Sequence, residues 1–540
     1  MRRSGARVLE TVQHPRIRPG TIQERLYQRR IAERALRENT LVVLPTGLGK
    51  TAIALRVIAE TLLQQPSRSI LFLAPTRPLV VQHGRSVAES LFAPPPLVLT
   101  GAIPPARRAD LLHPPQVVVA TPQVIENDLR DGGFPLDTFS LVVFDEAHRA
   151  VGDYPYVALG ARLRSLPNIR ILAMTASPGS RLPRIREVWS NLSIGHFELR
   201  ASDDPDVRPY SHAIGVETVT VPVPPEVRFL GEQLRGTFQQ QTEELFQLGA
   251  LPQGQGSLRD LLELGNRLRR QIDEARRRGV AAPANTWKAM TTQAIAMKAH
   301  HAAELIETQG VESLREFLDR QSAAKKTPAI QGFLSSPQVV EVFSRLLRLD
   351  LEHPKVAKAV EVVVGELRAH PNARVLLFAH YRQTAELLVE ELRKIPQGPV
   401  RPARFVGQSA RGDEAGLSQK EQVETLDRFR SGEFNCLVAT SVGEEGLDIP
   451  ATDLVVLYEP VPDEIRTIQR RGRTGRTHAG RVVVLLAEGT RDIGMWRSAR
   501  AKERRMHEML IQIEEEARKG TLAPPPVATV QRSLLEYPTN

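Results

Sequence analysis

The stretch Leu41–Thr51, LVVLPTGLGKT, constrains the possible fold of this chain more than any other part of the sequence. An apolar run breaks into PTGLGKT and is followed directly by a helical pattern, TAIALRVIAETLL. We expect a strand, a tight loop and a helix N-terminus, whose N–H groups and partial positive charge bind a polyphosphate. Lys50 should then reach the outer phosphates, and Thr51 should ligate Mg²⁺. Leu44 stands where the usual G-x4-G-K-[ST] pattern begins with glycine, so a turn without a ligand remains an alternative for this stretch alone. The loop residues expected to surround the phosphates are Thr46, Gly47 and Gly49.

The length and charge of the chain narrow its class. With 540 residues it is too long for one core, and three or four domains are expected. A net charge of +10 favours a polyanionic partner, although charge alone describes non-specific binding and not fold. Cys436 is the only cysteine, which excludes a disulfide framework, and it lies in an apolar run. Neither a signal peptide nor a stretch of 18 apolar residues is present, so we expect a cytoplasmic, nucleoid-associated protein without membrane contact.

The first half of the chain alternates short apolar strands with helices. Strands expected at 70–73, 97–99 and 117–120 each end next to a small hydroxyl residue, a glycine or an arginine. Open α/β sheets bind ligands at the carboxyl ends of their strands, so these side chains should lie at a binding edge. The pattern predicts a parallel, doubly wound sheet. The residues at the expected strand ends are Arg77, Thr100, Gly101 and Thr121.

The run LVVFDEAH, residues 141–148, delivers two carboxylates to a further strand end. We expect Asp145 to hold hydrated Mg²⁺ and Glu146 to orient and deprotonate the attacking water. His148 lies too far along to be a metal ligand and is expected to sense the γ-phosphate. Taken alone, this pair could instead cap a helix with a favourable charge. Its combination with the lysine loop earlier in the chain favours the catalytic interpretation.

From residue 226 to residue 345 the strand pattern is absent and helical periodicity replaces it, which predicts an inserted helical domain. One of its segments is rich in arginine, and we interpret it as an arm that contacts nucleic-acid phosphates. A solvated helix laced with carboxylate pairs is the alternative. The arginines concerned are Arg259, Arg267, Arg269, Arg270, Arg276, Arg277 and Arg278.

The second half returns to strands and helices and ends in IRTIQRRGRTGR, residues 465–476. Gln469, Arg473 and Arg476 share one helical face. If that face closes on the phosphate loop, both arginines can neutralise charge that develops on a γ-phosphate. A plain basic patch would not explain Gly472 and Gly475, which indicate a close approach of the backbone.

The motifs GLGKT, APTRPL, TPQVI, DEAH and TAS, followed by three further stretches after residue 346, resemble the ordered motifs of superfamily 2 helicases. The resemblance covers roughly residues 20–495. It implies two RecA-like α/β domains of parallel sheet with the helical domain inserted, and ATP and Mg²⁺ as cofactors. It also implies that Gln28, whose amide can pair with an adenine edge, reads the base, although a solvated helix face is the alternative at that position. Further residues implied are Gly446 and Asp448 in the ATP site, and Thr175 and Ser177 in coupling hydrolysis to nucleic-acid binding.

Within that superfamily, LPTGLGKT, FVGQ, GLSQKEQ, VATSVGEEGLDIP and the helical insert are similar to the Hef/FANCM group. This similarity implies an ATP-dependent DNA helicase or translocase that acts on forked or branched DNA with 3′ to 5′ polarity. We expect a Hef-like protein without the XPF-like nuclease half, because the look-alike Glu503-Arg504-Arg505-Met506 lacks the acidic partner of the nuclease motif. A duplex-RNA-dependent ATPase of the RIG-I-like type and a non-catalytic DNA-binding scaffold are the alternatives. The residues expected to hold the DNA backbone are Arg77, Thr100, Gly101, Thr121, Gln408 and Thr440.

The C-terminal tail carries one further pattern. Gln531, Leu534 and Tyr537 match most of a peptide motif that docks on the PCNA sliding clamp, while a frayed tail is the alternative. We expect a monomer. The predicted organisation is 1–205 for the first RecA-like domain, 206–225 for a linker, 226–345 for the helical domain, 346–495 for the second RecA-like domain, 496–519 for a helix and 520–540 for the tail.

Overall fold

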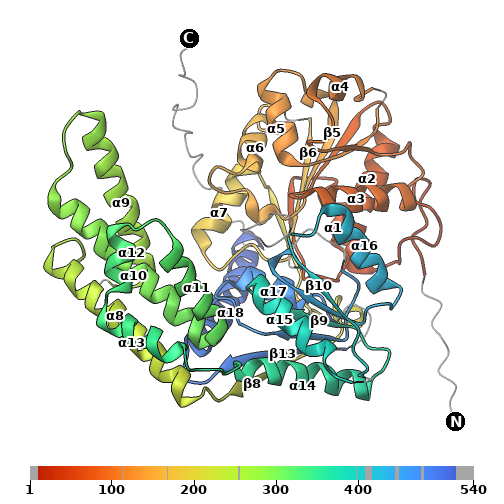
Figure 1. Cartoon of the computed structure of the whole chain (residues 1–540). Coiled ribbons are helices and arrows are strands. Elements are labelled where there is room, and N and C mark those ends of the chain that lie inside the picture. The colour runs from red at the N-terminus through yellow and green to blue at the C-terminus, as the bar shows by residue number, and fades with distance from the viewer. Residues whose placement is uncertain are drawn as a thin grey trace.

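The computed structural model contains two separate parallel β-sheets and a bundle of helices that projects to one side of them (Figure 1). It describes residues 10–518 except 114, 167, 253–255, 397, 408–415, 444–448 and 476–478. The expected clamp-binding peptide at 531–537 lies outside these residues. Among the described residues, no helix is both long enough and apolar enough to cross a bilayer.

The first sheet has the strand order β3-β4-β2-β5-β6-β1-β7, and all of its pairings are parallel. Its central strands are continuous Val, Ile, Leu and Phe runs because helices cover both faces. Helices α1, α2 and α3 pack on one face, and α5, α6 and α7 pack on the other. The strands are β1 (Thr40–Val43), β2 (Ser69–Leu73), β3 (Leu97–Leu99), β4 (Val117–Ala120), β5 (Phe139–Phe144), β6 (Arg170–Thr175) and β7 (His196–Leu199). The helices are α1 (Leu26–Ala35), α2 (Lys50–Gln64), α3 (Arg77–Ser90), α4 (Pro105–Asp110), α5 (Pro122–Arg130), α6 (Pro155–Leu163) and α7 (Leu182–Asn191).

The second sheet has the order β10-β11-β9-β12-β13-β8 and is also parallel. Cys436 begins β11 and is fully buried, as its apolar surroundings predict. The strands are β8 (Ile214–Val221), β9 (Val375–Phe378), β10 (Pro402–Phe405), β11 (Cys436–Ala439), β12 (Leu454–Leu457) and β13 (Gly480–Ala487). The helices that follow these strands or precede them are α14 (Pro354–Ala369), α15 (Arg382–Arg393), α16 (Gln419–Arg430) and α17 (Glu464–Arg471).

The expectation that 206–225 is only a linker is wrong. Strand β8 lies inside that range and pairs with β13 from Ile214 opposite Gly480 to Val221 opposite Ala487. Its residues from Ile214 to Thr220 are all exposed or only partly covered, as on an edge strand, and Val221 is buried. The sequence therefore shows no continuous apolar run of the kind that marks the inner strands. The chain thus enters the second sheet before it enters the helical domain.

The helical domain is confirmed, and it lies directly against the second sheet. The Gln309 amide donates to the Glu459 carboxylate over 2.5 Å, and Tyr381 Oη donates to Glu304 Oε1 over 3.3 Å. His353 Nε2 donates to the Glu307 carbonyl oxygen over 3.0 Å. The α9–α10 end extends beyond the rest of the bundle (Figure 1). The helices are α8 (Pro225–Gln247), α9 (Leu258–Arg277), α10 (Ala284–Thr308), α11 (Val311–Ala323), α12 (Pro328–Leu334) and α13 (Pro337–Leu346).

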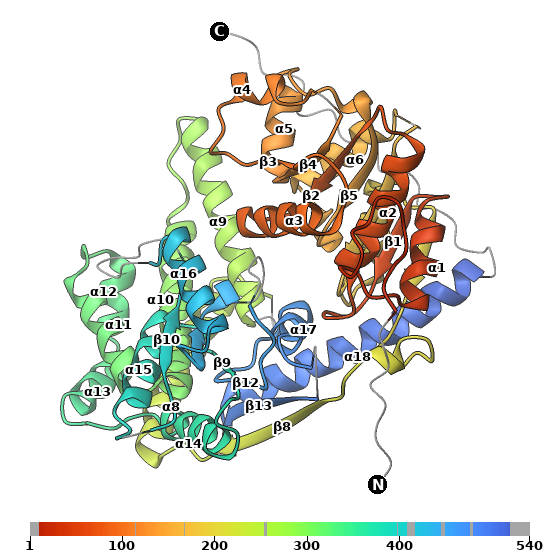
Figure 2. The ribbon, with the colours of Figure 1, turned by 90° about the vertical axis from the view of Figure 1, so that its right-hand side faces the viewer.

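The last described helix, α18 (Arg491–Arg518), returns from the second sheet to the first domain. It starts five residues earlier than the helix expected at 496–519, directly after the turn that follows β13. Figure 2 shows α18 running from beside β13 to the first domain. Met506, Leu510 and Ile513 are buried there in the core that covers one face of the first sheet. Helix α18 therefore packs against both α/β domains.

Candidate nucleotide site between the two sheets

The phosphate loop follows β1 and ends where α2 begins at Lys50. Gly47 and Gly49 both have φ +83°, a left-handed conformation that glycine adopts without steric cost. A Cβ atom at Gly49 would also overlap the Gln28 amide. The loop glycines are thus required by backbone geometry, and the first N–H groups of α2 are available to a phosphate.

Asp145 stands at the end of β5, where its amide donates to the Leu73 carbonyl oxygen over 2.9 Å. His83 Nε2 donates to Asp145 Oδ2, also over 2.9 Å. Burial raises the pKa of the Asp145 carboxyl, but the His83 hydrogen bond and the charges of His83 and Lys50 outweigh it, so the net direction is downward. Asp145 is therefore an ionised carboxylate suited to a divalent cation.

Glu146 adopts φ +49°, ψ +48°, a conformation that is strained for a residue with a side chain. This backbone places its carboxylate 3.3 Å from His148 Nδ1, which in turn lies 3.0 Å from Thr175 Oγ1. The Ser177 amide donates to the same threonine oxygen over 3.2 Å. Residues expected to act in hydrolysis and in coupling are thus joined in one buried chain of contacts. The Ser177 hydroxyl donates to Met506 Sδ of α18 over 2.9 Å.

Gln28 is buried beside the phosphate loop, which excludes the interpretation as a solvated helix face. Its Nε2 donates to the Leu48 carbonyl oxygen over 3.1 Å, and Tyr27 Oη donates to the same atom over 2.6 Å. Its Oε1 is buried and has no hydrogen-bond partner among the described residues. A buried acceptor without a donor fits the exocyclic amino group of adenine.

Helix α17 brings the arginine motif onto the phosphate loop. A Cβ atom added at Gly472 would lie 2.7 Å from Thr46 Cβ, and one at Gly475 would lie 2.6 Å from Ile214 Cγ1. Both glycines therefore allow the close approach that the sequence predicts. Arg473 is 9% exposed, and its carbonyl oxygen accepts from the Thr452 amide over 3.1 Å. Gln469 is buried on α17, but this helix ends at Arg471, so Arg473 lies beyond it and the expectation that it shares a helical face with Gln469 is wrong. The other predicted residues of the ATP site in this half, Gly446, Asp448 and Arg476, lie outside the described residues.

A cavity of about 780 Å³ borders the same loop. It is lined by the loop residues 45–48, the end of α17, residues 199–204, 210–212 and 214, and residues of α18. Arg471 of α17 forms an ion pair with Glu503 of α18 over 2.8 Å at its edge. The space lies between the two α/β domains, next to the positions that a nucleotide requires.

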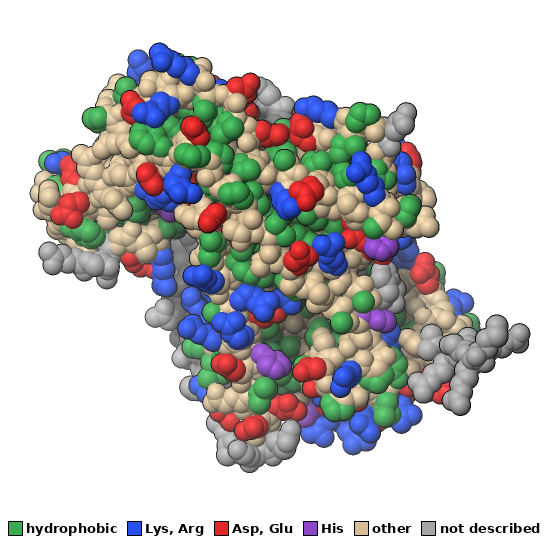
Figure 3. All heavy atoms as spheres, turned by 90° about the horizontal axis from the view of Figure 1, so that it is seen from below, with side chains coloured by type: hydrophobic (Ala, Val, Ile, Leu, Met, Phe, Trp, Pro, Cys, Tyr) green, Lys and Arg blue, Asp and Glu red, His purple; other side chains and the backbone are tan. Residues whose placement is uncertain are grey.

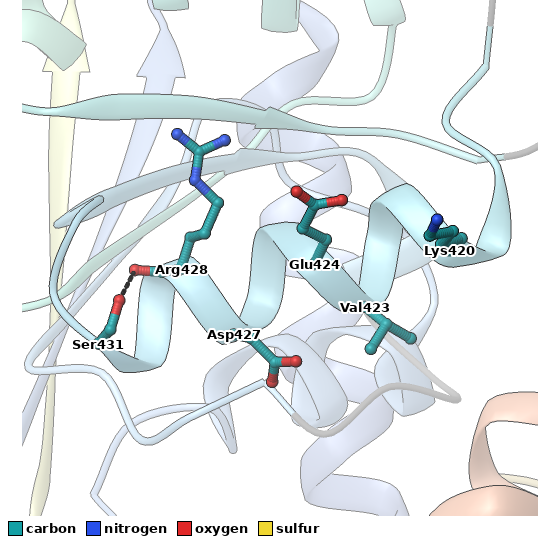
Figure 4. Close-up of a pocket in the computed structure, with 6 residues that line it drawn as sticks. All are labelled: Lys420, Val423, Glu424, Asp427, Arg428 and Ser431. Atoms are coloured by element: carbon teal, nitrogen blue, oxygen red, sulfur yellow. Dashed lines mark hydrogen bonds between the residues drawn. The ribbon is translucent and has the colours of Figure 1, made fainter.

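A second hollow lies on α16, far along the chain from the phosphate loop (Figure 4). Figure 4 shows Glu424 and Arg428 pointing to one side of this helix and Val423 and Asp427 pointing to the other. These side chains do not converge on a common point, so we do not treat this hollow as a functional site.

The predicted nucleic-acid contacts of the first domain lie together at one edge of its sheet. Arg77 Nη2 would lie 3.0 Å from a Cβ atom at Gly101, and both residues are exposed. The Thr121 amide donates to the Leu99 carbonyl oxygen, next to Thr100, over 3.3 Å. In the second domain Thr440 occupies the corresponding place after β11 and is buried, while Gln408 lies outside the described residues.

Sequence reasoning missed three residues that hold this site: His83, Tyr156 and Met506. Tyr156 Oη donates to the Asp145 carbonyl oxygen over 2.8 Å. His83 and Met506 lie far along the chain from the residues they contact, Tyr156 lies 11 positions after Asp145, and none of the three belongs to a motif expected to bind nucleotide. Met506 belongs to the stretch that was compared with a nuclease motif, and here it packs α18 on the first domain.

A phosphate loop, a carboxylate pair and an arginine helix on two facing parallel sheets define a nucleoside triphosphatase with two nucleotide-binding domains. Family models match the chain in three parts: DEAD/DEAH box helicase at residues 25–185, helicase conserved C-terminal domain at 355–478, and the helical bundle of a putative ATP-dependent RNA helicase at 231–353. The crystal structure of the Hef helicase domain of Pyrococcus furiosus matches with a TM-score of 0.65 and 40% sequence identity. It covers 88% of this chain and 98% of that one.

Two curated relatives are similar to this chain over most of its length. A putative ATP-dependent RNA helicase of Methanocaldococcus jannaschii is 38% identical over 92% of this chain and 62% of its own length. The Fanconi anemia group M protein of Gallus gallus is 33% identical over 88% of this chain and 25% of its own length. This chain therefore belongs to the Hef/FANCM family of superfamily 2 helicases, and its two sheets are RecA-like domains. It spans about three fifths or less of these two relatives.

Proposed function

We propose that this chain is an ATP-dependent DNA helicase or translocase that acts on forked or branched DNA with 3′ to 5′ polarity. The observation that carries the proposal is the contact between Gly472 of the arginine helix and Thr46 of the phosphate loop. It places the arginine helix against the loop that binds phosphates, so that a nucleotide between them would connect the two domains. Binding and release of that nucleotide can then change the relative position of two nucleic-acid edges.

The residues of this chain divide the work of hydrolysis as follows. Lys50 and the loop amides bind the phosphates, and Glu146 orients and deprotonates the attacking water. Thr51 and Asp145 would hold Mg²⁺, which neutralises charge on the outer phosphates when it is bound. Arg473 and Arg476 would stabilise the charge that develops in the transition state. Gln28 would select adenine.

The helical domain provides a second argument for a nucleic-acid substrate. Arg269, Arg270, Arg276 and Arg277 are exposed on α9. Their neighbours are less available, because Arg259 pairs with Glu263, Arg278 pairs with Glu274, and Arg267 donates to the Ala250 carbonyl oxygen. Some arginines of α9 are thus paired with carboxylates, as on a solvated helix. The others form a basic surface that can contact phosphates. By contrast, Figure 3 shows acidic and basic side chains interspersed over the face seen from below.

DNA is favoured over RNA by relatives named as ATP-dependent DNA helicases, of which one from Neurospora crassa is 34% identical over 86% of this chain. RNA remains the second candidate, because the Methanocaldococcus relative is named a putative RNA helicase. Backbone contacts do not read base sequence, so the arrangement of strand ends is compatible with both.

The test is phosphate release at one salt concentration with forked DNA, single-stranded DNA and duplex RNA, because salt changes all such affinities. We expect the largest stimulation with forked DNA. The Lys50→Ala and Glu146→Gln variants should lose turnover and still bind DNA, and strand displacement should require a 3′ tail. Stimulation by duplex RNA alone would replace DNA with RNA as the substrate, and equal phosphate release by wild type and Glu146→Gln would reject the enzyme assignment.

A further inference from the structure

We propose that His83 is a positioning residue of the ATP site, which holds the Asp145 carboxylate and links it to the helix that begins at the DNA edge. The inference rests on the proposed function, because it assigns roles to ATP and DNA at the sites already described. His83 lies outside the sequence motifs that identify the family, so no motif indicates this contact. It joins α3 to the end of β5 through two residues that are 62 positions apart in sequence.

The position of the His83 side chain is closely defined. The residue is 3% exposed, and its ring stacks on Phe72 of β2 with centroids 4.4 Å apart and planes 30° apart. Nε2 donates to Asp145 Oδ2 over 2.9 Å, while Nδ1 is buried without a hydrogen-bond partner among the described residues. An ionised carboxylate can only accept, so His83 Nε2 carries the proton of this hydrogen bond. Among the described residues, the imidazole therefore makes one hydrogen bond, which orients the Asp145 carboxylate.

Asp145 is held from three directions. His83 binds one carboxylate oxygen, and the Glu146 amide donates to the other over 3.0 Å. Tyr156 Oη donates to the backbone carbonyl oxygen. Carboxylates that bind metals are commonly oriented by such outer hydrogen bonds, and their loss costs about 10- to 100-fold in metal affinity. Of these three donors, His83 is the one whose side chain contacts the carboxylate itself, so its removal should affect metal binding most directly.

The same helix reaches the predicted DNA edge. Arg77 begins α3 and lies next to Gly101, and His83 follows six residues later, about 9 Å along the helix axis. Val80 and Val87 are buried in the domain core on the inner side of α3. Because an α-helix is stiff, a shift of its first turn when DNA binds Arg77 must also move His83. The contact therefore offers a direct route by which DNA adjusts the metal-binding carboxylate.

The test compares three variants of the full chain. His83→Leu removes the donor at similar volume, and His83→Gln can restore it through the amide. His196→Leu is the matched control, because His196 also pairs with a carboxylate in the first domain, at 3.0 Å from Glu198, but lies on the edge strand β7. Mn²⁺ binding in the presence of ADP is followed by electron paramagnetic resonance, and fluorescent ADP binding is measured in EDTA. Stimulation of phosphate release by forked DNA is the third measurement.

We expect His83→Leu to weaken Mn²⁺ binding about 10- to 100-fold with metal-free ADP affinity unchanged, and to reduce the stimulation by DNA. His83→Gln should recover most of the Mn²⁺ affinity, and His196→Leu should match wild type. The inference is overturned if His83→Leu binds Mn²⁺ like wild type, or if it loses ADP affinity in EDTA to the same extent. Wild-type protein that binds no ADP or is not stimulated by DNA would instead reject the proposed function.

Discussion

Gly472 at the end of α17 lies against Thr46 in the phosphate loop, so closely that a Cβ atom on Gly472 would be 2.7 Å from Thr46 Cβ. These two residues are 426 positions apart in sequence and belong to different RecA-like domains. A glycine at this position lets the backbone of the arginine helix reach the loop that binds phosphates. The proposed ATP site is therefore formed by both domains, and it is complete only when the two domains approach each other closely.

Gly472→Ala should impair this approach. The added methyl group overlaps Thr46, and overpacking of this kind costs roughly 1–3 kcal/mol, or about 5- to 150-fold in the population of the closed arrangement. We expect DNA-stimulated phosphate release to fall by a factor in this range, with little change in DNA affinity. Gly365→Ala in α14 is the control, because a Cβ atom there meets nothing within 4 Å. Equal rates for the two variants would show that the close contact is not part of the active arrangement.

Gln28→Ala should weaken the preference for ATP over GTP. The buried Oε1 of Gln28 can accept from the amino group of adenine, whereas guanine presents an oxygen at the equivalent place. Loss of one such hydrogen bond is worth about 1 kcal/mol, so the ratio of kcat/KM values should fall roughly five- to tenfold. Gln64→Ala, on the exposed end of α2, should leave the ratio unchanged. An unchanged ratio in Gln28→Ala would mean that another group reads the base.

Leu510→Ala should release α18 from the first domain. Leu510 is buried in the first-domain core, and truncation of a buried leucine costs about 2–5 kcal/mol. We expect faster tryptic cleavage within α18 and a lower unfolding temperature. The neighbouring Ile511 is 47% exposed, so Ile511→Ala should change either property only slightly. If both variants resist trypsin equally, the helix is held by other contacts.

The motifs could be predicted because each is a short contiguous segment with its own physical logic. Gly49 shows this well, since its left-handed backbone is required by the loop itself. Strand β8 was missed because an edge strand lacks the apolar run on which the recognition of inner strands depends. The pairing of His83 with Asp145 and of Ser177 with Met506 could not be predicted either. Both contacts depend on how the sheets and α18 are assembled, and no local pattern encodes that arrangement.

Acid should destabilise the junction between the helical domain and the second RecA-like domain through His353. Burial and the charge of Lys355 lower the pKa of His353 from 6.5 to about 3. Between these values the unfolded chain binds a proton that the folded chain does not, so stability falls as the pH drops from 6.5 towards 3. The loss between pH 7.5 and pH 5 is about 2 kcal/mol. This loss is measured as the difference between the free energies of unfolding in urea at the two pH values.

His353→Asn should flatten that pH dependence, because asparagine can still cap α14 but does not titrate. At neutral pH the free energy of unfolding of this variant should be about 1 kcal/mol lower, because the hydrogen bond to the Glu307 carbonyl oxygen is lost. His301→Asn is the control, because the His301 side chain is 42% exposed. An equally steep loss of stability in His353→Asn and wild type would assign the acid sensitivity to other groups.

The most direct test of the shared ATP site is single-turnover ATP hydrolysis by Arg473→Lys in the presence of saturating forked DNA, with the nucleotide Kd measured in parallel. Lysine keeps the positive charge of this buried position but loses the planar fork that binds phosphate oxygens. The account predicts a Kd within about threefold of wild type and hydrolysis at least ~100-fold slower, in keeping with an arginine supplied across a domain boundary. Hydrolysis at the wild-type rate would contradict it, because the Arg473 guanidinium would then contribute nothing to the chemical step.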